Sequence, residues 1–206
     1  MNLSLRPADL PMTTQAAEGL PRRRFTVAEI EAAVRAGVID EDEGFELIGG
    51  QIVPMSPKGA VHESVKFEVN RFFQRAAPEH LTIAQETTLR LDAATFLEPD
   101  FCVFRRHLDP NKVNGSAVPL AVEVADSSLA YDRGRKIGVD AAFDVREVWV
   151  VDARRAFTWV HHRFGGEGYD DLFQAPTTAP MTPTLAPELA VRLSDLGGGP
   201  SPDKSC

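Results

Sequence analysis

Cysteine is scarce in this sequence, which has only Cys102 in an apolar run and Cys206 at its C-terminal end. Neither cysteine stands in a spacing typical of metal ligands, and the two suggest no disulfide framework. We therefore expect Cys102 to be a small core residue, because free cysteine is among the most buried residue types. This scarcity excludes a disulfide-rich scaffold and favours a reducing, cytoplasmic location.

Long apolar runs are missing as well. No run approaches the ~20 residues of a membrane-spanning helix. Residues 1–15 lack the apolar core of a secretory signal. The sequence therefore predicts a protein that does not associate with membranes.

The familiar nucleotide-binding and hydrolase motifs are also absent. The sequence contains no G-x-x-x-x-G-K-[ST], no G-x-G-x-x-G and no G-x-S-x-G. His161 and His162 have no CxxC or HExxH companion, so we interpret both as structural residues. As successive residues of a strand, one of them is expected to face inward and the other outward.

The composition is that of an ordinary globular protein with an acidic balance. The 206 residues are 43% hydrophobic and 25% charged, enough for one domain with a sizeable core. The net charge of −8 shows that the surface as a whole is not a basic nucleic-acid footprint. We predict flexible tails at residues 1–24 and 197–206 around a single domain at 25–196.

Local patterns predict alternating strands and helices. Thr26 and Glu29 form a capping box that opens a helix ending near Gly37, and a second helix is expected at 60–77. The Gly49-Gly50 pair predicts a β-hairpin. Further strands are expected at 81–85, 87–91, 101–104, 119–124, 146–153, 156–164 and 169–173. A turn is expected at 92–98, and a Pro-rich surface connection at 176–187.

These patterns predict an α/β or α+β fold with helices packed on a sheet. One helix, capped by Asp132, is expected to cross between the strands that contain Val124 and Trp149. If those two strands are parallel neighbours, the connection should be right-handed.

The most unusual stretch is VPLAVEVADSSLAYDRGRK, from Val118 to Lys136. It contains an apolar strand with one carboxylate, Glu123, which needs a specific partner because an unpaired buried charge is costly. Asp100 begins another strand, so two adjacent strands could bring both carboxylates together. Two close carboxylates repel unless one is protonated or a cation lies between them.

Mg²⁺ is the hard cation that one or two carboxylates typically bind, with waters and substrate phosphates in the remaining positions. Lys136 could then orient a metal-activated water or stabilise charge on a phosphodiester. Glu46 and His62 are outer candidates for the same site. The alternative is that these charges merely solvate the ends of strands, and their spacing alone does not decide between the two.

The order Pro99-Asp100, Glu123-Val124 and a downstream Lys136 resembles the PD-(D/E)xK nuclease superfamily. The resemblance is closest to its Uma-two family of restriction-endonuclease-like proteins and extends from about Phe25 to Leu196. The segments that carry it are FELIGGQIVPMSP, EPDFCVF, VPLAVEVADSSLAYDRGRK and VREVWVVD.

The resemblance implies a restriction-endonuclease-like core with a mixed central sheet flanked by helices. It also implies Mg²⁺- or Mn²⁺-dependent cleavage of DNA, with Asp100 and Glu123 as metal ligands and the Val124 carbonyl as a further one. Lys136 matches the catalytic lysine, displaced onto a helix because Ala125 occupies the usual E-x-K position. Glu46 would be a third acid.

Three functions remain open from the sequence. The first is a metal-dependent DNA endonuclease, expected as a homodimer because cutting both strands needs two sites. The second is a catalytically silent nuclease-fold module that binds DNA or a protein partner, which the net charge of −8 favours. The third is a metal-dependent hydrolase of a small phosphoester.

Overall fold

The computed structural model describes residues 23–155, 157–164 and 168–197. The predicted tails lie almost entirely outside these residues. The described strands form two sheets. The four-stranded sheet contains β1 (Phe45–Ile48), β2 (Gln51–Pro54), β4 (Leu89–Asp92) and β5 (Thr95–Leu97). The six-stranded sheet contains β3 (Leu81–Gln85), β6 (Phe101–Arg105), β7 (Leu120–Ala125), β8 (Val148–Asp152), β9 (Phe157–Phe164) and β10 (Tyr169–Pro176).

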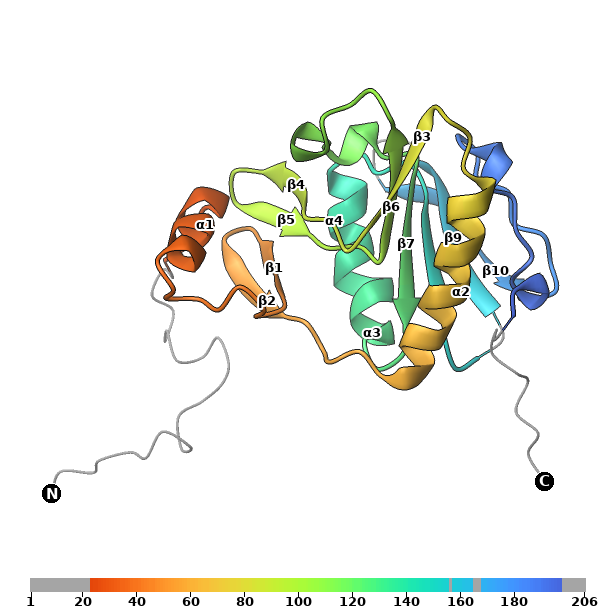
Figure 1. Ribbon diagram of the computed structural model, residues 1–206, viewed down its shortest axis with the longest axis horizontal. Coiled ribbons are helices and arrows are strands. Elements are labelled where there is room, and N and C mark those ends of the chain that lie inside the picture. Colours follow the sequence, from red (N-terminus) through yellow and green to blue (C-terminus); the bar gives the residue numbers. More distant parts are fainter. Residues whose placement is uncertain (1–22, 156, 165–167, 198–206) are drawn as a thin grey trace, which may run out of the picture.

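The helices flank the larger sheet, except for the first, which lies with the smaller sheet to one side (Figure 1). The α-helices are α1 (Val27–Arg35), α2 (Ala60–Ala76), α3 (Leu129–Tyr131) and α4 (Ile137–Ala142). A π-helical turn, Asp132–Lys136, connects α3 to α4. Short 3-10 turns occupy Pro110–Lys112, Gly115–Ala117, Pro187–Leu189 and Leu193–Asp195.

The first helix and hairpin form as predicted. Thr26 accepts a hydrogen bond from the Glu29 N–H, and the Glu29 side chain accepts one from the Thr26 N–H. Gly49 and Gly50 connect β1 to β2 with φ of 56° and 79°, which favours glycine at both positions. A Cβ at Gly50 would also lie 2.8 Å from the Phe25 carbonyl oxygen. Glycine therefore allows the N-terminal segment to pack on this turn.

The turn predicted at 92–98 is wrong. The chain reverses at Ala93-Ala94, where the Ala94 N–H donates to Asp92. Residues Thr95–Leu97 then form β5, which pairs with both β4 and β1. A strand of three residues has too few positions for an alternating pattern, so its pairing partners decide its structure.

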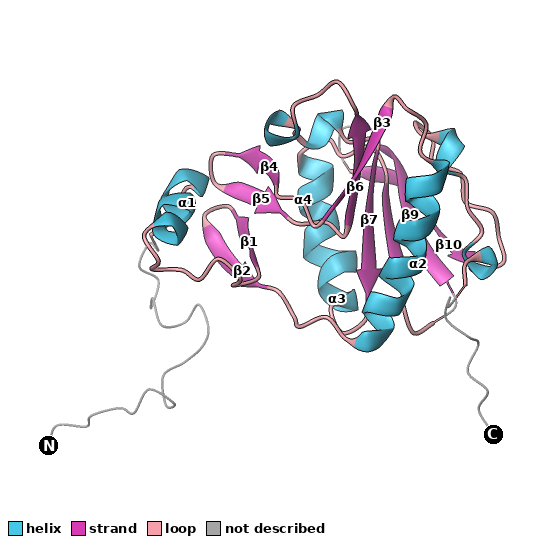
Figure 2. Cartoon of the chain, viewed as in Figure 1, coloured by secondary structure: helices cyan, strands magenta, loops and turns pink. Residues whose placement is uncertain are grey.

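The larger sheet is mixed, as the fold class predicts. Its strand order is β10-β9-β8-β7-β6-β3, and β7 pairs with β8 in parallel while the other neighbours are antiparallel (Figure 2). Every residue of β7 and of β8 is buried. Helices cover both faces of these central strands, which explains their nearly continuous apolar sequences.

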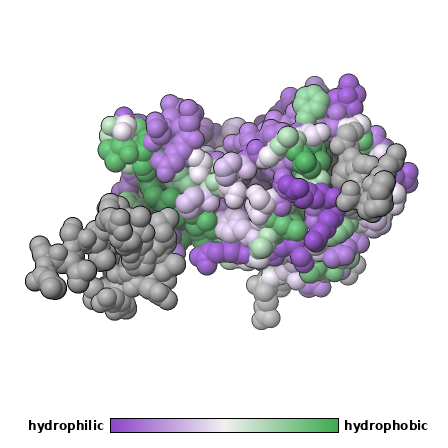
Figure 3. All heavy atoms as spheres, turned by 90° about the horizontal axis from the view of Figure 1, so that it is seen from below, coloured by the Kyte–Doolittle hydropathy of each residue, from purple (hydrophilic) through white to green (hydrophobic). Residues whose placement is uncertain are grey.

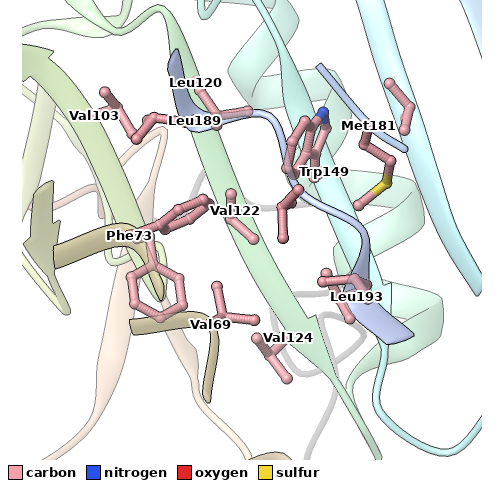
Figure 4. Packing of buried hydrophobic residues seen from close by; sticks show 14 of the residues in the cluster. Val69, Phe73, Val103, Leu120, Val122, Val124, Trp149, Met181, Leu189 and Leu193 are labelled. Carbon is pink, nitrogen blue, oxygen red and sulfur yellow. The ribbon is translucent and has the colours of Figure 1, made fainter. Parts of the chain in front are cut away.

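One face of the larger sheet is covered by α2. Val65, Val69 and Phe73 follow one another at intervals of four residues and belong to the same apolar cluster as Val122 and Val124. Figure 4 shows Val69 and Phe73 beside these strand residues. The Phe73 ring meets the edge of the Phe101 ring, with centroids 5.6 Å apart. Burial of each such side chain contributes about 1.5–3 kcal/mol to folding.

The C-terminal segment adds to the same core. Residues 176–187 are mostly exposed, as the predicted surface connection requires, but Met181, Pro183 and Ala186 within them are buried. Met181 pairs with Val191 through two backbone hydrogen bonds, and Leu189 is fully buried. Met181, Leu189 and Leu193 lie over Trp149 and its neighbours (Figure 4). Proline-rich sequence can thus be buried where its few apolar residues meet a sheet.

The opposite face is covered by α3 and α4. Leu129 and Ile137 pack on a second apolar cluster that includes Cys102, which is fully buried as predicted. Asp132 does not cap this helical segment, contrary to the prediction. The segment begins at Leu129, and Asp132 lies within it and accepts a hydrogen bond from the Ser128 hydroxyl. Asp132 is a residue type that often caps helices, but nothing in its neighbourhood indicated that the helix begins three residues earlier.

The surface mixes polar and apolar residues on the face shown in Figure 3.

His161 is buried against the Tyr169 ring, whereas His162 is partly exposed and lies 3.0 Å from Asp171, so the two face opposite sides as predicted. Among the described helices, none is long and apolar enough to cross a membrane.

Candidate active site

The two predicted carboxylates meet at the C-terminal end of β7. Phe101 of β6 pairs with Val122 of β7, so Asp100, just before β6, lies opposite Glu123. The Val124 N–H donates a 2.8 Å hydrogen bond to Asp100 Oδ2. Asp100, Glu123 and Val124 line one cavity of about 350 Å³. Figure 1 places this end of β7 near the first turn of α2 and near α3.

Lys136 reaches the same cavity from the π-helical turn. Its side chain is only 4% exposed, and its Nζ lies 3.0 Å from Glu123 Oε1 and 2.6 Å from Glu46 Oε1. A π-helical turn accommodates an extra residue, which changes the direction of the side chains beyond it. Lys136 thus contacts Glu123 from a segment 13 residues further along the chain.

Glu46 lies at the centre of the site, although the sequence suggested an outer position. It belongs to β1 in the smaller sheet and is fully buried. Three donors reach its carboxylate, namely the Glu98 N–H at 3.0 Å, the Tyr131 hydroxyl at 2.6 Å and Lys136 Nζ. Glu46 thus attaches the smaller sheet to the lysine-bearing segment and holds Lys136 in place.

His62 lies on the first turn of α2 and contacts Asp100 rather than standing outside the site. Its Nε2 is 3.2 Å from Asp100 Oδ2, and its Nδ1 is 3.1 Å from Glu63 Oε1. Burial would lower the pKa of His62, but hydrogen bonding and charge from Asp100 outweigh it and raise that pKa. The histidine is thus a partner of the predicted metal ligand.

Several acidic side chains lie close together in the site, so a further cation there would be favourable. Burial, together with the nearby Asp132, Asp100 and Glu46, raises the pKa of Glu123 well above its ordinary value despite Lys136. Burial would also raise the pKa of Asp100, but its hydrogen bonds from His62 and Val124 and the charge of Lys58 lower it.

Lys136 stays charged in this setting. Burial would lower its pKa, but Glu123 and Glu46 raise it well above the ordinary value of lysine. The site therefore holds a buried ammonium group at its centre and carboxylates on both sides of it.

Sequence reasoning missed four of the titratable residues that line the cavity, namely Lys58, Glu98, Tyr131 and Asp132. Burial raises the pKa of Glu98, which precedes Asp100 by two positions. Lys58 precedes His62 by four positions, and this short separation was the signal that could have placed both at the same end of the helix. Tyr131 and Asp132 belong to the quoted AYDRGRK segment, but no local pattern shows that they face Glu46.

The donor set fits a hard divalent cation held by few protein ligands. The cavity is lined by carboxylate oxygens, which Mg²⁺ and Mn²⁺ prefer. Within the described residues, however, no three His, Cys, Asp or Glu side chains form a group that could hold a metal ion. This geometry suits a cation bound by one or two carboxylates and otherwise by water and substrate, and it does not suit a closed zinc site.

Asp140 lies behind the site, one helical turn after Lys136. It is buried, and its Oδ2 has no hydrogen-bond partner among the described residues. Burial raises its pKa to about 7, although Lys136 opposes this effect. Because the unfolded chain loses this proton near pH 3.8, Asp140 destabilises the fold increasingly from about pH 4 to pH 7 and by a constant amount above.

We expect Asp140→Asn to remove this pH dependence. Relative to the parent, the free energy of unfolding of the variant should rise by roughly 2–4 kcal/mol between pH 4 and pH 8. A pKa difference of one between the folded and unfolded states is worth about 1.4 kcal/mol. Urea unfolding at several pH values measures this shift. Asp144→Asn, at an exposed position nearby, is the matched control. A difference that does not change with pH would contradict the prediction.

Comparisons with known proteins support the fold. The model of the family Uma2, described as "Putative restriction endonuclease", matches residues 30–203. A solved structure of "a putative nuclease belonging to DUF820" from Anabaena variabilis is similar with a TM-score of 0.64 and 16% identity. That match covers 83% of this chain and 96% of the other. None of the curated proteins matches this chain. The predicted restriction-endonuclease-like fold is thereby confirmed.

Proposed function

The chain belongs to the Uma2 family, described as "Putative restriction endonuclease", and from this premise we propose that it is a divalent-metal-dependent DNA endonuclease. The observation that carries the proposal is the meeting of Asp100, Glu123 and Lys136 in one cavity. These residues come from two neighbouring strands and a following helical turn.

Asp100 and Glu123 are the residues that would hold Mg²⁺ or Mn²⁺, with the Val124 carbonyl as a further oxygen. A cation held there supplies positive charge beside the phosphodiester and activates water at neutral pH. The hydrogen bonds from His62 and Val124 to Asp100 Oδ2 fix the orientation of that carboxylate. Oriented ligands of this kind bind a metal more tightly than mobile ones.

Lys136 orients the attacking water or stabilises the negative charge that develops on the phosphate. Glu46 and Glu123 hold its ammonium group at 2.6 and 3.0 Å. A charged donor fixed in a buried site needs little reorganisation during the reaction, which makes it effective. Lys136 thus replaces the lysine that Ala125 does not provide.

The test is a plasmid-nicking assay. The purified protein is expected to convert supercoiled plasmid to the nicked form with Mg²⁺ or Mn²⁺ and to leave it intact with EDTA, because the carboxylates then lack their cation. A chromogenic phosphodiester assayed in parallel separates a DNA endonuclease from a hydrolase of small phosphoesters. Absence of nicking with both metals over a range of protein concentrations would contradict the proposal. Linear plasmid would show that both strands are cut at one place, which is expected of a homodimer because it has two active sites.

The second candidate is a nuclease-fold module that binds DNA or a protein partner without cutting. The net charge of −8 and the existing ion pairs of Lys136 favour it, since the buried acids are already partly neutralised. Calorimetry with Mn²⁺ distinguishes the two functions. The endonuclease binds Mn²⁺ in a manner that depends on Asp100, whereas a silent module need not bind the metal.

A further inference from the structure

Lys58 lies in the connection between β2 and α2, at the edge of the candidate active site. Its Nζ is 3.4 Å from Asp100 Oδ1 and also contacts Glu86 Oε1. Its side chain is 33% exposed, whereas that of Asp100 is 6% exposed. Lys58 lines the cavity together with Ser56 and Ser127. It is therefore a partly exposed cation beside a buried carboxylate.

Lys58 belongs to a closed ring of alternating charges around Asp100. From Asp100 Oδ2 the ring passes to His62 at 3.2 Å and from there to Glu63 at 3.1 Å. Lys66 continues it, 2.8 Å from Glu63 and 3.0 Å from Glu86, and Lys58 returns it to Asp100 Oδ1. The 3.4 Å contact is its longest link and exceeds the 2.7–2.9 Å typical of a charge-assisted hydrogen bond.

The two oxygens of Asp100 therefore differ. Oδ2 accepts a hydrogen bond from the Val124 N–H and contacts His62, so its orientation is fixed. Oδ1 faces the ammonium group of Lys58 across the long contact. Oδ1 is thus the oxygen at which one cation can replace another without loss of the hydrogen bonds that hold the carboxylate.

Glu86 keeps Lys58 close to the cavity after such a replacement. Its φ of 46° lies in the left-handed region, which is strained for a residue other than glycine, and strained positions cluster at functional sites. Its N–H donates to the Asp100 carbonyl oxygen at 3.3 Å, and its carboxylate contacts Lys58. The conformation of Glu86 therefore ties Lys58 to the backbone of the proposed metal ligand.

We propose that Lys58 neutralises Asp100 in the metal-free protein, that a divalent cation displaces it, and that the displaced ammonium group binds the phosphate of the DNA. This inference rests on the proposed function. A lysine side chain suits the exchange because it is a compact charge on a flexible stem. The same residue thus lowers metal affinity and raises the cleavage rate.

The test compares Lys58→Ala with the parent and with Lys66→Ala. Lys66 belongs to the same ring, where its ion pairs are with Glu63 and Glu86 and not with Asp100, so it is the matched control. In titration calorimetry without DNA, Lys58→Ala should bind Mn²⁺ at least about threefold more tightly than the parent. This is the scale of a partly exposed ion pair. Nicking at saturating Mn²⁺ should be about tenfold slower or more, the scale of one charged hydrogen bond.

Each result decides a specific point. Unchanged or weaker Mn²⁺ binding by Lys58→Ala overturns the inference, as does tighter binding with an unchanged nicking rate. Equal effects of Lys58→Ala and Lys66→Ala overturn it too, because they would reflect the ring as a whole. If the parent neither binds Mn²⁺ nor nicks DNA, the proposed function itself fails. Lys58→Met, which keeps the apolar stem, repeats the test if thermal unfolding shows that Lys58→Ala is destabilised.

Discussion

Asp100→Asn and Glu123→Gln are each expected to lower metal-dependent nicking at least ~100-fold, the scale of losing one group that stabilises the transition state. Each substitution keeps the shape of the side chain and removes the charge that would hold the cation. Asp100 and Glu123 supply the two carboxylates of the proposed site, so neither can replace the other. The rate of plasmid nicking at saturating Mg²⁺ measures the effect.

The fold should survive both substitutions. Glu123→Gln removes one of the two carboxylates beside Lys136, and Lys136 keeps Glu46 as its ion-pair partner. Asp100→Asn keeps an oxygen that can accept the Val124 N–H. Thermal unfolding checks this, and the exposed Asp144→Asn is the matched control for nicking. Folded variants that nick at the parent's rate would show that these carboxylates do not hold the metal.

Lys136→Met is expected to lower the free energy of unfolding by about 3–5 kcal/mol, because breaking a buried ion pair leaves an unpaired charge. Glu46 and Glu123 would both lose the ammonium group that lies between them. Methionine preserves much of the volume of the lysine stem, so the change tests charge rather than packing. Urea unfolding at pH 7 measures it, with the exposed Lys112→Met as control.

The double variant Lys136→Met/Glu46→Gln should recover part of this loss. Without its charge, residue 46 no longer needs a cation. The Glu98 N–H can still donate to the amide oxygen, and the amide NH2 can donate to the Tyr131 hydroxyl oxygen, which now accepts. Nicking should stay lost in the single and the double variant, because both lack the ammonium group. A single variant that is within 1 kcal/mol of the parent would show that Lys136 does not stabilise the buried acids.

The candidate site was predictable where local chemistry carried it. Asp100 and Glu123 could be identified because a carboxylate at the end of an apolar strand needs a partner, and neighbouring strands bring such ends together. Their positions in one cavity agree with this reasoning, while their roles in metal binding remain predictions. Lys136 was proposed from its place downstream of Glu123, and the resemblance matched it to a catalytic lysine. Its contact with Glu123 is made from a π-helical turn that no local pattern indicates.

The sequence by itself determined the elements whose signals are short-range. The Thr26 capping box, the Gly49-Gly50 turn and the four-residue spacing in α2 each specify a structure within a few residues, and each is present. The contact between Glu46 and Lys136 could not be predicted from the sequence, because the two residues are far apart along the chain and belong to different parts of the fold. The physical reason is burial, because opposite charges removed from water are costly unless they pair with each other.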